Sequence, residues 1–186
     1  PFWRGTKPGN SVAEKIPAKK WAIIKHARSG SNLFRQWNPG KTSQDKQGEE
    51  YVKLIRTVRN GMEALKKTET CSCPESHGVA TGGRRRKGHC RHQKRLIKRI
   101  RADLEAPGLA FIYGSVLPVP APARFPGREE VRQGQKDVAE ESRTSLSVNN
   151  AVYVPADDLQ LRSVDFRTPY PTDTVHLGTH GILALG

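Results

Sequence analysis

The sequence has little of what a large hydrophobic core or a membrane span requires. Of its 186 residues, 35% are apolar and 6% are aromatic, and the mean hydropathy is −0.67. No stretch approaches the roughly 18 to 20 consecutive apolar residues that cross a bilayer, so we expect no membrane partner. The low apolar content predicts a modest core with irregular extensions.

Cysteine is also scarce. Three cysteines cannot form an even-numbered disulfide framework, and we therefore expect an intracellular, reducing compartment, the cytoplasm or an organelle matrix. The first residues lack the charged segment and apolar run of a secretory signal, and Pro1 indicates either removal of an initiator methionine or cleavage of a precursor. The glycine-rich loops that bind dinucleotides or nucleoside triphosphates are absent from the sequence.

Positive charge, in contrast, is abundant and unevenly placed. The formal net charge is +14, and residues 1–101 hold 25 Lys and Arg against 7 Asp and Glu. The density peaks in residues 84–101, where ten of eighteen residues are basic and none is acidic. Such clustering is typical of nucleic-acid-binding proteins. The alternatives are a solvated surface, an anionic-membrane patch or a nuclear-localisation signal.

The basic residues that we expect to contact nucleic acid lie in a glycine-flanked loop, on the helix after it and in the N-terminal segment. They are Arg84, Arg85, Arg86, Lys87, Arg91, Lys94, Arg95, Lys98, Arg99, Arg101, Lys19, Lys20 and Lys25. Their role would be to neutralise phosphates and release counterions. The aromatic residues among the N-terminal basic ones would either stack on unpaired bases or anchor the segment to its own protein.

The apolar pattern predicts an α+β fold in three parts. Residues 1–42 form a basic, irregular arm. Residues 43–106 form a small helical hairpin, with helices over about 43–69 and 91–105 whose apolar residues recur at spacings of three and four, joined by a Cys-, His- and Arg-rich loop. Residues 107–186 form an extended, Pro-rich and β-rich region.

Within this last part, LAFIYGSVLPV predicts a strand, residues 117–126 an extended linker, and EEVRQGQKDVAEES a short polar helix or an irregular stretch. Asn149-Asn150 lies between two β-prone runs and predicts a β-hairpin over residues 145–154. LQLRSVDF and the C-terminal VHLGTHGILAL could add strands.

Cysteine and histidine cluster near the basic run and suggest a zinc site. The ligand set that we consider is Cys71, Cys73, Cys90 and His92, with His77 or His89 as substitutes. Zinc takes four such donors in a tetrahedron, but these pairs are spaced more tightly than the usual finger motifs. We favour the alternative, in which these residues bind no metal.

Catalytic patterns are weaker, and we expect no enzyme. Cys90 could pair with His176 or His180 as a nucleophile and its base, although no carboxylate orients the histidine. A metal-dependent nuclease could use Asp157, Asp158 or Asp165 with His176, although no spacing favours it. Other adjacent acidic residues are expected to be solvated.

The sequence therefore predicts a structural RNA-binding protein of a large ribonucleoprotein particle, similar in style to ribosomal proteins. The partners would be structured ribosomal or genomic RNA and, through the C-terminal half, neighbouring proteins. One alternative is a viral coat or nucleocapsid protein that packages RNA. Another is a zinc-dependent nucleic-acid-binding regulator or nuclease.

Overall fold

The computed structural model describes residues 23–42, 44–67, 76–78, 88–116 and 127–185. Two compact units make up the chain. One combines residues 24–116 and 123–154, and the other contains residues 155–186 together with residues 1–23 and 117–122. No helix in the described ranges is long and apolar enough to cross a bilayer.

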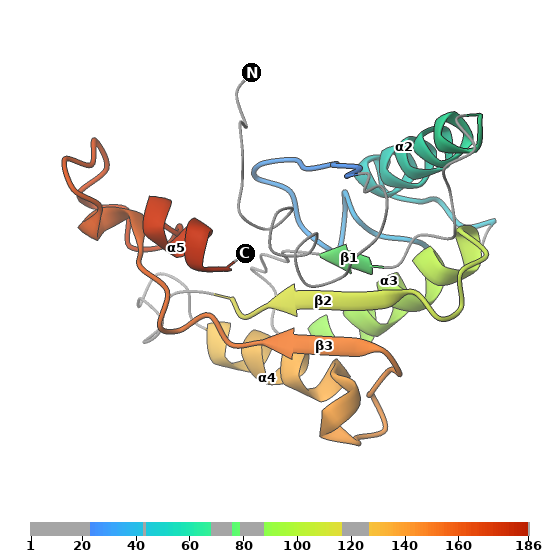
Figure 1. Cartoon of the computed structure of the whole chain (residues 1–186). Coiled ribbons are helices and arrows are strands. Elements are labelled where there is room, and N and C mark those ends of the chain that lie inside the picture. Colours follow the sequence, from blue (N-terminus) through green and yellow to red (C-terminus); the bar gives the residue numbers. More distant parts are fainter. Residues whose placement is uncertain (1–22, 43, 68–75, 79–87, 117–126, 186) are drawn as a thin grey trace, which may run out of the picture. The chain divides into compact units, whose positions relative to one another are not determined.

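The first unit is built on a parallel β-sheet of three strands in the order β1-β2-β3 (Figure 1). These strands are β1 (Ser76–Gly78), β2 (Ala110–Gly114) and β3 (Ala151–Val154). β1 pairs with β2 through Ser76 and Ala110, and β2 pairs with β3 through Phe111 and Ala151. A parallel pair needs a long crossover, which helices supply here.

Three longer helices accompany this sheet: α2 (Glu49–Lys66), α3 (His89–Asp103) and α4 (Arg128–Val138). α3 packs against α4 behind the strands in the view of Figure 1. Alternate strand residues Phe111 and Tyr113 are buried in the core, whereas Ile112 and Val152 are 43% and 45% exposed on the other face. The covered face and the helices share one apolar cluster.

The predicted helices exist with shifted ends. α2 begins later than residue 43 because Gly48 is held in extended backbone before its first turn. A Cβ on Gly48 would lie 2.2 Å from the carbonyl oxygens of Arg35 and Gln36, so only glycine fits. The Gln36 carbonyl in turn accepts the N–H groups of Glu50 and Tyr51, which the first turn of a helix leaves unpaired.

The predicted β-hairpin over residues 145–154 is wrong. Residues 145–150 form turns, Asn150 has a φ of +54°, and only residues 151–154 form a strand. That strand pairs in parallel with β2, and the Asn150 carbonyl accepts the N–H of Phe111. Residues 161 and 177 form one isolated antiparallel bridge instead of extended strands, and residues 179–185 form the short helix α5 (Thr179–Leu185).

Part of the predicted N-terminal arm packs on α2. Glu50, 1% exposed, lies 2.9 Å from both His26 Nε2 and Lys53 Nζ and 3.4 Å from an Arg28 nitrogen. The hydrogen bond from Lys53 contributes most to lowering the pKa of Glu50, against the cost of burial. Residues 1–22 of the arm and the predicted linker at 117–126 lie outside the described residues. The division at residues 42–43 and 106–107 stays a prediction.

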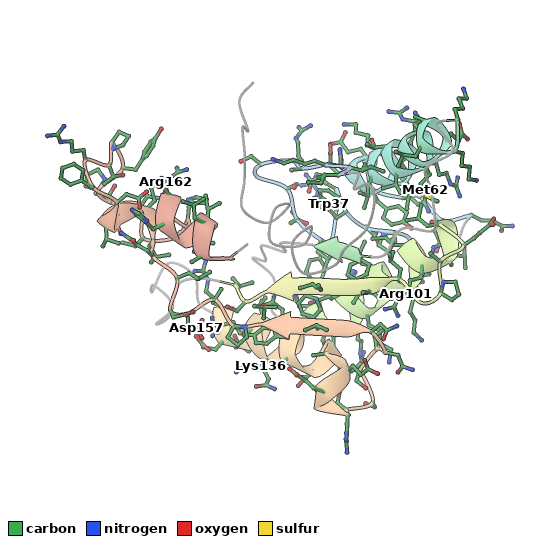
Figure 2. The ribbon with its side chains drawn as sticks, in the orientation of Figure 1. Trp37, Met62, Arg101, Lys136, Asp157 and Arg162 are labelled. Carbon is green, nitrogen blue, oxygen red and sulfur yellow. The ribbon has the colours of Figure 1, made fainter. Side chains whose placement is uncertain are left out.

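Arg101 is among the residues expected to contact RNA, but its side chain is buried and binds the protein's own backbone. Its side chain is 9% exposed and donates to the carbonyl oxygens of Leu109, Asn149 and Asn150 at 2.7 to 3.2 Å (Figure 2). The guanidinium therefore joins the end of α3 to the segments that enter β2 and β3.

We predict that Arg101→Met lowers the free energy of unfolding by about 2–4 kcal/mol, because it leaves buried carbonyl groups without a donor. Lys98→Met on the exposed side of the same helix is the matched control, with an expected change of about 0.5 kcal/mol or less. Denaturant unfolding measures both. Equal effects of the two substitutions would contradict this role of Arg101.

His89 gives the fold a dependence on pH. Its ring is 1% exposed, and neither ring nitrogen has a hydrogen-bond partner among the described residues. Burial, followed by the nearby charge of His92, lowers the pKa of His89 to about 4. The unfolded chain therefore binds this proton at a higher pH than the folded chain does.

Stability should accordingly fall as the pH drops from about 6.5 towards 4, with a slope approaching 1.4 kcal/mol per pH unit from this group. His89→Phe should remove most of that slope, whereas the exposed His180→Phe should retain it. Unfolding free energies between pH 4 and 7 test this, and an unchanged slope in His89→Phe would refute it.

Candidate active site

A carboxylate and an imidazole meet in the loop that precedes α5. Asp173 and His176 are three residues apart, and His176 Nδ1 lies 2.9 Å from both carboxylate oxygens of Asp173. An ionised carboxylate only accepts hydrogen bonds, so the contact requires the proton on Nδ1. The side chain of His176 is 70% exposed, which leaves Nε2 accessible as a proton acceptor.

Backbone pairing fixes this loop against residues 160–163. Arg162 N–H donates to the His176 carbonyl at 2.8 Å, Ser163 N–H to the Asp173 carbonyl at 3.0 Å, and Gly178 N–H to the Gln160 carbonyl at 2.9 Å. The dyad is thus held on a paired backbone, although its residues lie in a loop.

Gly178 and Asp165 fix the junction between the loop and α5. A Cβ on Gly178 would lie 2.3 Å from Asp165 Oδ1, so a side chain there would displace the aspartate. The other oxygen of Asp165 accepts the Thr179 N–H at 2.7 Å in the first turn of α5. Position 178, two residues after His176, therefore requires glycine.

Asp173 is held in its ionised form. Partial burial opposes the charge, but the hydrogen bonds from the His176 ring and from the N–H groups of His176 and Val175 outweigh it and lower the pKa of Asp173. A guanidinium nitrogen of Arg162 lies 3.5 Å from Oδ2. Since the pKa is lowered on folding, the ionised carboxylate stabilises the loop above the ordinary carboxyl pKa, and this stabilisation is lost as the pH falls through the lowered value.

This pair was only half anticipated from the sequence. The sequence predicts His176 as a partner of Cys90, or of Asp157, Asp158 or Asp165, and does not single out the carboxylate three residues before it. The available signal was the Asp-x-x-His spacing, which allows both side chains to meet within one turn of loop.

The predicted nucleic-acid residues have varied surroundings. Arg99 lies 2.6 Å from Asp103, and Lys94 donates to the Ser145 carbonyl at 2.8 Å. Arg91, Lys98 and Lys25 are exposed, and Arg95 is half-buried. Arg84, Arg85, Arg86, Lys87, Lys19 and Lys20 lie outside the described residues.

The predicted zinc ligands are not brought together in the described part of the chain. Cys90 is half-buried, with its Cβ 3.3 Å from the position of a Cβ on Gly134, and the His92 ring centroid lies 4.3 Å from that of Phe34. Cys71 and Cys73 lie outside the described residues, among which no group of three potential ligands occurs. The zinc site stays a prediction.

The sequence of residues 3–186 matches the model of a protein family described as carbohydrate esterase, sialic acid-specific acetylesterase. The chain belongs to this family. The match points to a hydrolase and overturns three predictions: that the protein is no enzyme, that it is a structural RNA-binding component, and that RNA is its partner. The viral-coat and zinc-regulator or nuclease alternatives fall with them.

A solved structure gives independent support for the fold. The chain is similar to an X-ray structure of an Arabidopsis thaliana protein, with a TM-score of 0.58 and 20% sequence identity, over 84% of this chain and 53% of that one. The chain therefore spans about half the length of that protein. No curated protein matches the sequence.

The family also changes the interpretation of the charge. An excess of Lys and Arg indicates a polyanion partner only where the side chains are free to bind it. Arg101, Arg99 and Lys94 instead make internal contacts. Their charge serves, at least in part, to hold the protein's own carbonyl and carboxylate groups.

Proposed function

We propose that Asp173 and His176 form the acid–base dyad of an esterase that removes O-acetyl groups from carbohydrates, sialic acids in particular. The observation that carries the proposal is the contact of His176 Nδ1 with the Asp173 carboxylate in a chain whose family is described as carbohydrate esterase. Ester hydrolysis needs a group that removes a proton from the attacking hydroxyl or water, and an imidazole oriented by a carboxylate does this.

In the proposed reaction, Nε2 of His176 accepts the proton of the nucleophile as its oxygen attacks the acetyl carbonyl. The imidazolium then gives the proton to the departing sugar oxygen, and hydrolysis yields acetate and the free sugar hydroxyl. Asp173 keeps the proton of the neutral ring on Nδ1 and stabilises the imidazolium that forms. The hydrogen bonds from the His176 ring and from the backbone N–H groups of His176 and Val175 keep Asp173 ionised throughout.

The test is acetate release from an O-acetylated sialic acid by the natural protein that carries this sequence. His176→Ala and Asp173→Asn should each lower kcat by on the order of 10³–10⁴, because both changes remove the oriented base.

The matched control is His180→Ala, which removes an exposed imidazole four residues from His176 and should leave kcat within about twofold. Thermal unfolding of each variant separates loss of catalysis from loss of fold. A folded His176→Ala protein with activity near that of the unsubstituted protein would refute the proposal.

A further inference from the structure

The segment between residues 160–163 and the dyad loop presents two aromatic rings to solvent. Tyr170 is 53% exposed and Phe166 is 86% exposed. An arginine guanidinium lies over each ring. The Arg162 guanidinium lies 4.7 Å from the ring centre of Tyr170, and the Arg167 guanidinium lies 5.0 Å from that of Phe166. An exposed ring beside a reactive site is a common feature of ligand-binding surfaces.

Arg162 connects one of these rings to the dyad. Its guanidinium nitrogen lies 3.5 Å from Asp173 Oδ2, the same oxygen that lies 2.9 Å from His176 Nδ1. Arg162 and His176 therefore flank one carboxylate, and the Arg162 side chain is 40% exposed. A ligand group that reaches the Arg162 guanidinium is thus close to the catalytic imidazole.

The guanidinium retains capacity for a second anion. It carries five N–H donors in a planar fork, and its side-chain bond within the described residues is the single 3.5 Å contact with Asp173. Such a fork matches the two oxygens of a carboxylate. The Tyr170 ring lies 4.7 Å from the guanidinium carbon and limits its movement, which reduces the entropy lost when an anion binds.

We propose that Arg162 and Tyr170 form a subsite for an acidic sugar, in which the guanidinium binds the sugar carboxylate and the phenol ring lies against the sugar's apolar face. The subsite rests on the proposed function of the dyad and deepens it. Arg162 and Tyr170 select acidic sugars over neutral ones, and the selection occurs next to the group that removes the acetyl ester.

A positioning role of Arg162 is the competing explanation, because Arg162 also touches Asp173. The two roles predict different kinetics. Loss of positioning lowers kcat for every substrate, whereas loss of the subsite raises KM for acidic substrates alone.

The kinetic test compares an O-acetylated sialic acid with a neutral O-acetylated hexose, in the natural protein that carries this sequence. Arg162→Gln should raise KM for the acidic substrate by about 10- to 100-fold, the range expected for a lost charge-assisted hydrogen bond. KM for the neutral substrate should stay within about twofold, and any change in kcat should be the same for both substrates. Arg162→Lys should recover part of the affinity, and Tyr170→Ala should weaken binding of both sugars.

The matched control is Arg167→Gln, which removes the arginine over the Phe166 ring. It should change neither kcat nor KM for either substrate. Equal losses of kcat on both substrates in Arg162→Gln, without a selective rise of KM for the acidic one, would assign a positioning role alone and overturn the subsite. Unchanged KM for the acidic substrate would overturn it as well.

A binding titration with free sialic acid, which has no ester to hydrolyse, separates this proposal from that of the dyad. The unsubstituted protein and His176→Ala should bind it alike, and Arg162→Gln should bind it at least about tenfold more weakly. If binding follows this pattern while His176→Ala remains active, the dyad proposal fails and the subsite stands. If His176→Ala is inactive while Arg162→Gln binds free sialic acid normally, the subsite proposal fails and the dyad proposal stands.

Discussion

The candidate site depends on the carboxylate of Asp173. It contacts the His176 ring, accepts the N–H groups of Val175 and His176 and lies beside Arg162. A carboxylate with this many donors stays ionised, and an ionised carboxylate fixes the proton of the neutral imidazole on Nδ1. All of these groups lie within residues 162–176, so the chemistry is set by local geometry. The bond from Gly178 to Gln160 and the carboxylate of Asp165 then hold the loop in place.

Charged side chains also hold together the unit that contains the sheet. Arg101 satisfies carbonyl groups before β2 and β3, and Glu50 gathers His26, Arg28 and Lys53 around the start of α2. Buried charges of this kind are tolerated because each is paired or hydrogen-bonded. The high net charge of the sequence is therefore partly structural.

The helices were predictable from the sequence because their apolar residues repeat at helical spacing: Tyr51, Leu54 and Val58 are buried as expected. The parallel sheet was not, because turn chemistry does not specify a strand's partner. Asn150 does adopt the positive φ of a turn, but the strand after it pairs with residues some forty positions earlier. Similarly, spacing alone does not distinguish Asp173 from other acidic residues. Its role becomes visible when residues 160–163 pair with its loop and direct the carboxylate at His176.

The geometry of the site requires that Asp173 hold neutral His176 with its proton on Nδ1. Nitrogen-15 NMR of the labelled imidazole measures the tautomer directly. We expect neutral His176 to be mainly the Nδ1–H tautomer, and Asp173→Ala to shift the population towards Nε2–H, which free imidazole side chains prefer. A His176 ring that is already protonated on Nε2 in the unsubstituted protein, or a tautomer that Asp173→Ala does not change, would contradict it.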